Sequence, residues 1–228
     1  MDRFKRYGIY AVPEGALYRA GAEWLGWDSV AGKAVAQPQV PGLPAAPEGL
    51  TATPRKYGFH GTIKPPFRLA DADQAEDLDA ATRAFCAMRA PVVIDRLEVR
   101  RLGGFVAIVP AAPSATLSDL AAATVEALDG FRAPATEAEL EKRRKSGLSV
   151  RQEQNLLRWG YPYVMEEFRF HMTLTGKLSG ADAEATRDAL SAQFAPALPE
   201  PFVIDSLCLM GEDDQGMFHL VQRYTFSG

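Results

Sequence analysis

Two segments of this 228-residue chain occur twice, in the same order. Residues 57–63 (YGFHGTI) resemble residues 168–174 (FRFHMTL), because an aromatic residue, Phe, His, Thr and an aliphatic residue stand at the same places in each. Further along, residues 91–97 (PVVIDRL) resemble residues 201–207 (PFVIDSL). The first pair is offset by 111 positions (57 to 168) and the second by 110 (91 to 201). Self-similarity at a nearly fixed offset predicts two copies of one structural unit.

A weaker echo supports the same division of the chain. Residues 9–13 (IYAVP) resemble residues 106–110 (VAIVP), and a segment with helical spacing of apolar residues follows each. Each copy would then hold a helix-backed antiparallel sheet with one His-x-Thr strand. We therefore expect one bilobal α+β domain over residues 1–228, in which a pseudo-twofold axis relates two sheets around a central cleft.

Hydrophobic periodicity gives the expected elements. Strands are expected at residues 7–12, 57–63, 92–101, 105–109, 168–175, 203–210 and 217–226. Helices are expected at residues 14–27, 73–89, 114–129, 137–145, 150–158 and 181–194. Pro65 and Pro66 should end the first His-x-Thr strand, because proline cannot donate to a sheet ladder. Two inserted segments, residues 28–54 and 130–165, interrupt the repeat, and the Gly, Pro and Ala content of the first predicts an irregular excursion or lid.

The duplicated His-x-Thr motif is the strongest indication of chemistry. Side chains two apart on a strand share a face, so His60 should lie beside Thr62, and His171 beside Thr173. In-line opening of a phosphodiester needs a base for the incoming oxygen and an acid for the leaving oxygen, and two imidazoles can supply both near neutral pH. The threonine hydroxyls can donate to the non-bridging phosphate oxygens. This arrangement requires neither a metal ion nor a cofactor.

At these motifs the chain resembles the 2H phosphoesterase superfamily, which takes its name from two His-x-Thr/Ser motifs in a duplicated fold. A closer resemblance, to the phosphonate-metabolism proteins encoded in phosphonate-utilisation operons, is carried by residues 57–67 (YGFHGTIKPPF), 147–152 (GLSVRQ), 159–163 (WGYPY) and 168–175 (FRFHMTLT). The superfamily resemblance implies cleavage of cyclic phosphodiesters, or the related ligation of RNA ends. It also implies that His60 and His171 are the acid–base pair and that Thr62 and Thr173 bind phosphate.

Three side chains close to the motifs are further candidates for substrate contact. Tyr57 begins the first motif. Lys64 follows Thr62 by two positions and could extend the phosphate-facing row, although a solvated lysine at a strand end fits equally well. Arg169 precedes His171 by two positions and should share its face, with a salt bridge at the sheet edge as the alternative.

The basic cluster at residues 141–145 (EKRRK) lies shortly before the second motif. Arg144 from this cluster, Arg151, Tyr161 and Tyr163 are candidates for a lid or a substrate-binding surface, because aromatic rings beside arginine suit stacking on a base or a sugar phosphate. The alternative is a solvated helix face, which is the usual role of such a charge run.

The charge balance limits the partners that we expect. With 25 basic and 29 acidic residues the chain has a net charge of −4, which disfavours binding to long nucleic acid. A small phosphorylated or cyclic-phosphate substrate fits this balance. Two alternatives stay open: RNA-end processing or ligation of the 2′–5′ type, which needs a basic track reaching the cleft, and non-catalytic binding of a phosphorylated ligand, which does not need both imidazoles.

Other features bear on location and metal binding. No apolar run is long enough to span a membrane, and the N-terminus lacks the apolar core of a secretion signal. Cys86 and Cys208 are isolated, which fits buried thiols in a reducing cytoplasm. His60, His171 and His219 are far apart and form neither a His-x-His nor a His-Glu-x-x-His pattern, which disfavours a metal site.

Overall fold

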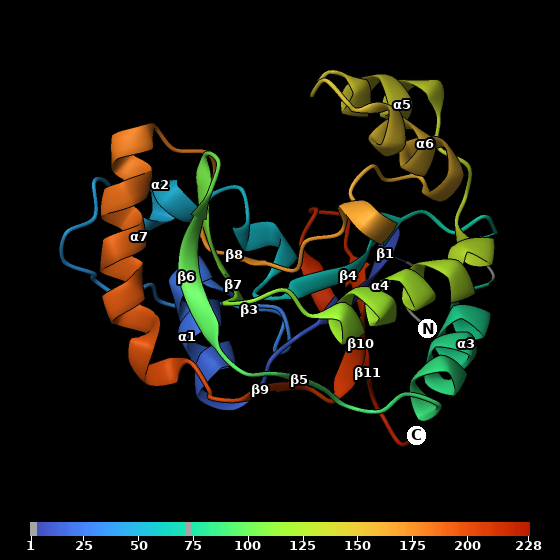
Figure 1. The fold of residues 1–228 in the computed structure, drawn as a ribbon, viewed down its shortest axis with the longest axis horizontal. Helices are drawn as coiled ribbons and strands as arrows, with labels where there is room; N and C mark the ends of the chain where they lie inside the picture. The colour runs from blue at the N-terminus through green and yellow to red at the C-terminus, as the bar shows by residue number, and fades with distance from the viewer. Residues whose placement is uncertain (1–3, 72–73) are drawn as a thin grey trace.

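The computed structural model describes residues 4–71 and 74–228, and its centre is a seven-stranded antiparallel sheet with the strand order β11-β10-β1-β4-β8-β7-β6 (Figure 1). The strands are β1 (Arg6–Ala11), β4 (Gly61–Phe67), β6 (Leu97–Leu102), β7 (Phe105–Pro110), β8 (Met172–Thr173), β10 (Ser206–Glu212) and β11 (Phe218–Thr225). Two small ladders stand apart from this sheet: β2 (Trp27–Asp28) with β3 (Lys33–Ala34), and β5 (Val92–Ile94) with β9 (Phe202–Ile204).

The α-helices are α1 (Gly15–Leu25), α2 (Pro47–Thr51), α3 (Ala75–Ala87), α4 (Ala115–Ala127), α5 (Glu137–Arg144), α6 (Val150–Trp159) and α7 (Gly180–Phe194). Short 3-10 helices occupy Arg55–Tyr57, Asp129–Phe131, Met165–Glu167 and Ala195–Ala197. Helix α3 packs on β10 and β11, α7 packs on β6 and β7, and α4 packs on β4. The fold is therefore α+β, as expected, and all six helices expected from the sequence are present within a few residues.

Repeat-related residues pair with each other in two places. Gly61 of β4 pairs with Met172 of β8, and these two residues occupy the same position in the two His-x-Thr motifs. Val93 of β5 pairs with Val203 of β9, again the same position in the two copies of the second repeat. The two motifs, which are far apart in sequence, consequently lie side by side at the middle of the sheet.

The structure differs from the expectation of two separate sheets. The two halves form one sheet, joined at its centre by the single Gly61–Met172 pair. The junction is short because β8 has only two residues, whereas a strand over residues 168–175 was expected. Both histidines accordingly stand just before their strands, His60 before β4 and His171 before β8.

Pro65 and Pro66 do not end β4, contrary to expectation. Tyr7 pairs with Phe67 and Ile9 pairs with Lys64, so that Gly8 of β1 alone faces both prolines. This is a β-bulge, where a ladder hydrogen bond is already missing and proline is tolerated. The strand can therefore continue through the prolines to Phe67.

The inserted segment 130–165 contains the two expected helices, α5 and α6. Capping boxes begin both of its helices, with Thr136 and Glu139 at α5 and Ser149 and Gln152 at α6. Figure 1 shows the two helices packed together and set apart from the sheet. The segment 28–54, for which an irregular excursion was expected, contains the end of β2 together with the short elements β3 and α2, and the residues between β3 and α2 form no helix or strand.

Two remaining expectations concern membranes and cysteines. Within the described residues no helix combines the length and the apolar character that a membrane span requires. Cys86 and Cys208 are both buried and both free, as expected.

Candidate active site

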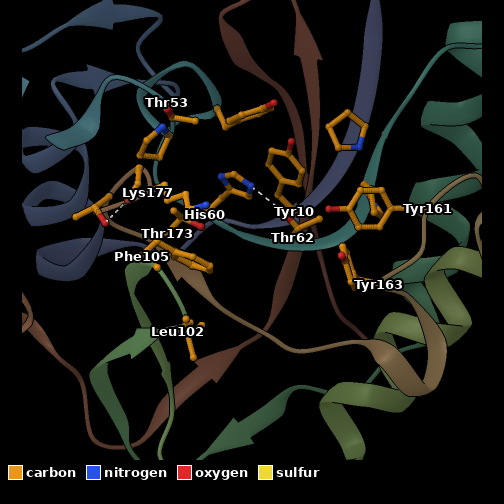
Figure 2. A pocket seen from close by; sticks show the side chains of 18 of the residues that line it. Tyr10, Thr53, His60, Thr62, Leu102, Phe105, Tyr161, Tyr163, Thr173 and Lys177 are labelled. Atoms are coloured by element: carbon orange, nitrogen blue, oxygen red, sulfur yellow. Dashed lines mark hydrogen bonds between the residues drawn. The ribbon is translucent and has the colours of Figure 1, made fainter. Parts of the chain in front are cut away.

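A cavity of about 980 Å³ opens where the two His-x-Thr motifs meet. Figure 2 shows His60, Thr62 and Thr173 at its centre, with Lys177 and Thr53 on one side and Tyr161 and Tyr163 on the other. Residues from both halves of the sheet line it, because β4 and β8 are neighbours. Its size suits a ligand larger than a bare phosphate.

The ring of His60 is held on three sides. Its Nδ1–H donates to the carbonyl oxygen of Gly58 at 2.9 Å, and its Nε2 lies 3.0 Å from the hydroxyl of Thr62. The ring of Tyr10 stacks on it, with 3.7 Å between the ring centroids. A proton on Nδ1 leaves the Nε2 lone pair directed to the cavity and to Thr62.

The environment of His60 favours the neutral imidazole. Burial is the main cause and, with the charge of His171, lowers the pKa of His60 from 6.5 to about 4, although the carbonyl of Gly58 opposes the shift. The two motifs approach each other through the Gly61–Met172 pair, which brings the charge of His171 near His60. A neutral His60 can accept a proton at pH 7.

His171 repeats the local geometry of His60 in a more open setting. Its Nδ1–H donates to the carbonyl oxygen of Arg169 at 2.7 Å, which again is the carbonyl two residues before the histidine. Its ring lies 5.7 Å from the ring of Phe105, a residue of the cavity wall. The carbonyl contact fixes the same tautomer in both motifs, with Nε2 left for a ligand.

The two sites differ because Tyr10 and its repeat counterpart differ. Tyr10 pairs with Thr62, and Ala107 pairs with Thr173 at the matching place in the other half. The tyrosine ring covers His60, whereas an alanine cannot cover His171. The duplicated motif thus gives two histidines of unequal environment.

Apolar residues fix both motifs from behind. Phe59 and Ile63 flank the first motif and are buried, as are Phe170 and Leu174 around the second. Gly61 allows a close approach at the junction, since a Cβ there would overlap the ring of Phe170. His60, Thr62 and Thr173 are therefore directed to the cavity wall and the flanking apolar side chains to the core, whereas His171 is not itself among the described lining residues and lies at the edge of the cavity, against Phe105.

Three of the additional candidates line the cavity, namely Tyr57, Tyr161 and Tyr163. The ring of Tyr57 lies 6.4 Å from that of His60, and the rings of Tyr161 and Tyr163 lie 5.8 Å apart in an edge-to-face arrangement. In Figure 2 the hydroxyl of Tyr161 points toward the centre of the cavity.

Lys64 does not extend the phosphate-facing row. Its side chain is 2% exposed, and its ammonium lies 3.1 Å from the carboxylate of Asp129 and 3.3 Å from the carbonyl of Val125. Ile9 pairs with Lys64 and Tyr10 with Thr62, so a second register shift places Ile63 as an extra residue between Thr62 and Lys64. Because side chains alternate only along a regular strand, this shift removes the face relation between Lys64 and Thr62.

The three arginine candidates lie outside the cavity wall. Arg144 is held by the carboxylates of Glu137, Glu141 and Glu153. Arg151 pairs with Glu166 on the outer surface. The Arg169 guanidinium donates to the carbonyls of Glu166 and Phe168, which turns it away from His171.

Among the basic and tyrosine side chains of the described cavity wall, four were not expected from the sequence: Arg6, Tyr10, Arg143 and Lys177. Only one of them had a sequence signal, because Arg143 belongs to the basic cluster in which Arg144 was singled out. Arg6 and Tyr10 come from β1 and reach the cavity because β1 is the sheet neighbour of β4. None of the described residues that line the cavity is acidic, although the chain has 29 acidic residues.

The fold and the site define a duplicated α+β protein with paired His-x-Thr motifs at a cavity whose described wall has basic but no acidic residues. The family model described as "Protein of unknown function (DUF1045)" matches residues 62–219, which is more than half of the chain. The chain belongs to that family.

Curated relatives give a second comparison. The chain is 42% identical over 235 residues to a protein of Janthinobacterium sp. (strain Marseille) and 33% identical over 213 residues to one of Laribacter hongkongensis (strain HLHK9). Both are named "Ribose 1,5-bisphosphate phosphokinase PhnN". The matches cover 100% and 92% of this chain but only 52% and 49% of those proteins, so the chain spans about half their length.

Among solved structures, E. coli LigT complexed with 3′-AMP is similar over the full length of both chains. The TM-score is 0.48 and the sequence identity is 10%. A likeness of this degree assigns no activity.

Proposed function

We propose that this chain is a 2H-type phosphodiesterase that opens a small cyclic phosphodiester without a metal ion. The main support is the matched tautomer of the two imidazoles, each of which donates from Nδ1 to the carbonyl two residues before it. A structural histidine needs no particular tautomer, whereas an acid–base pair needs both Nε2 atoms turned to the substrate. The Thr62 hydroxyl, which lies 3.0 Å from Nε2 of His60, would turn from that nitrogen to the phosphate when substrate binds. The absence of acidic residues from the described cavity wall supports an anionic substrate.

In the proposed reaction, Nε2 of His60 takes a proton from a water molecule as its oxygen attacks the phosphorus. The bond between phosphorus and one ring oxygen breaks, and the imidazolium form of His171, which carries a proton on each nitrogen, gives its Nε2 proton to that oxygen while Nδ1–H keeps its contact with the carbonyl of Arg169. One water is consumed, and the product is a phosphate monoester beside a free hydroxyl. Thr62 and Thr173 donate to the non-bridging oxygens, whose charge they stabilise in the transition state. The lowered pKa of His60 supports its role as the base.

The relatives' printed name supports a ribose cyclic phosphate as substrate, with a 2′,3′-cyclic nucleotide as the alternative. Opening a ribose 1,2-cyclic phosphate that carries a 5-phosphate can yield ribose 1,5-bisphosphate, which is the compound in that name. The chain contains no GxxxxGK[S/T] phosphate-binding loop. We therefore place the named kinase activity in the half of those relatives that this chain does not span, and the proposed reaction one step before it.

The test is hydrolysis of a panel of cyclic phosphodiesters by the purified protein in EDTA. His60→Ala and His171→Ala should each lower kcat by about 10²- to 10⁴-fold. His219→Ala is the matched control, because His219 is the third histidine of the chain, pairs with Asp213 and belongs to neither His-x-Thr motif. Turnover that survives in both motif variants would refute the assignment. Tight binding of the panel without turnover would instead indicate a non-catalytic binder.

A further inference from the structure

We propose that the substrate carries a second phosphate, which Arg143 and Tyr161 bind at one end of the cavity. The inference rests on the proposed function, because it assumes that the cyclic phosphate lies at the two histidines. It adds a specificity-determining site on the inserted segment, and it favours phosphorylated sugar cyclic phosphates over substrates with a single phosphate.

The first observation is the distribution of free positive charge in the cavity wall. Among the described residues, three with Lys or Arg side chains line the cavity: Arg6, Arg143 and Lys177. Arg6 is already neutralised, since its guanidinium donates two hydrogen bonds to the buried carboxylate of Glu212. The described part of the chain places no carboxylate within ion-pair distance of Arg143 or Lys177. Two free cations thus face a cavity whose centre is occupied by His60, Thr62 and Thr173.

The second observation is the contrast between Arg143 and its neighbour. Arg144 contacts the carboxylates of three glutamates and lies off the cavity. The guanidinium of Arg143 instead lies over the ring of Tyr161, with 4.6 Å to the ring centroid. Stacking on an aromatic face orients a guanidinium and keeps its N–H groups available for a bidentate contact with phosphate. The glutamates of α5 therefore neutralise Arg144 and leave Arg143 without a carboxylate partner among the described residues.

The third observation is the position of Arg143 and Tyr161 within the cavity. Tyr161 lies across the cavity from Lys177, and its hydroxyl is directed toward the centre (Figure 2). A phosphate between that hydroxyl and Arg143 would stand to one side of the reacting phosphorus, as a phosphate on the far end of a sugar does. Lys177 packs against Gly104 at the other end, and within the described chain no aromatic ring lies under its ammonium to orient it. The oriented arginine is therefore the better phosphate ligand of the two.

The experiment compares ribose 1,2-cyclic phosphate with and without a 5-phosphate. We expect the unaltered protein to prefer the 5-phosphorylated compound in kcat/KM by about 10- to 100-fold, the effect of a charge-assisted contact. In Arg143→Gln this ratio should fall to within about threefold. Lys142→Gln, an equal charge change on the preceding residue, does not touch the cavity and should keep the full ratio. Lys177→Gln tests the opposite end and should also keep it.

Each outcome separates the subsite from the proposed function. Equal hydrolysis of the two compounds by the unaltered protein overturns the subsite and leaves the phosphodiesterase intact. Loss of the preference in Lys177→Gln but not in Arg143→Gln also overturns it. If neither compound is hydrolysed, the proposed function fails, and calorimetric binding of the same pair still decides the subsite. A preference in affinity that Arg143→Gln abolishes then supports it, and equal affinities overturn it.

Discussion

As the pH is lowered, His60 should remain neutral at pH values at which an ordinary histidine is already charged. Burial under Tyr10 lowers its pKa from 6.5 to about 4. At pH 5 such a residue is roughly nine-tenths neutral, whereas a histidine with a pKa of 6.5 is roughly 3% neutral. The difference between these two pKa values corresponds to no more than about 3 kcal/mol of free energy between the charged and neutral forms of His60, because water in the open cavity screens part of the effect.

The assay is a nitrogen NMR titration of protein labelled only in histidine. The chain has three histidines, so single His→Gln variants assign every signal. The nitrogen shifts of neutral His60 should show the proton on Nδ1, as its contact with Gly58 requires. A midpoint at 6.5 or above, or a proton on Nε2 in the neutral form, would refute the reasoning.

The pH dependence of the free energy of unfolding gives an independent check that the pKa of His60 is lowered and not raised. The pKa of His60 is lower in the folded than in the unfolded chain, so the unfolded state binds more protons between pH 6.5 and about 4. The free energy of unfolding is then constant above pH 6.5 as far as this residue is concerned. It falls as the pH is lowered through the window and levels off below it. His60→Gln should lose less stability than the unaltered protein over the same range in urea titrations.

Two further predictions concern the parts of the fold that hold the site. Asp129→Ala leaves the buried ammonium of Lys64 without its carboxylate and should lower the free energy of unfolding in urea by about 3 kcal/mol. Lys64→Met should lower it by less than about 1 kcal/mol. Equal losses of stability in the two variants would contradict the ion-pair argument. Gly61→Ala should lower stability by about 1–3 kcal/mol and reduce hydrolysis, because the new Cβ meets the ring of Phe170 at the junction of the two halves. Gly49→Ala, where a Cβ has open space, is its control, and equal thermal shifts of the two variants would argue against a tight junction.

Some of the candidate contacts could be identified from residue type but not placed. Tyr57, Tyr161 and Tyr163 line the cavity, as a substrate-contact role requires. The arginine expected from the basic cluster was Arg144, whereas the one that reaches the cavity is Arg143. On a helix, adjacent residues point about 100° apart, so that the choice between them depends on how the helix docks. The sequence does not contain that orientation.

The sequence by itself determined the duplication, the antiparallel α+β class and the pairing of each histidine with a threonine, because the repeat and the period of a strand are local properties of the chain. Only the tertiary structure decided that the halves merge into one sheet, that Tyr10 covers one histidine while Ala107 leaves the other open, and that Lys64 turns into the core. Strand neighbours, bulges and helix orientation depend on contacts between distant segments, and these contacts set the burial that makes two similar motifs chemically different.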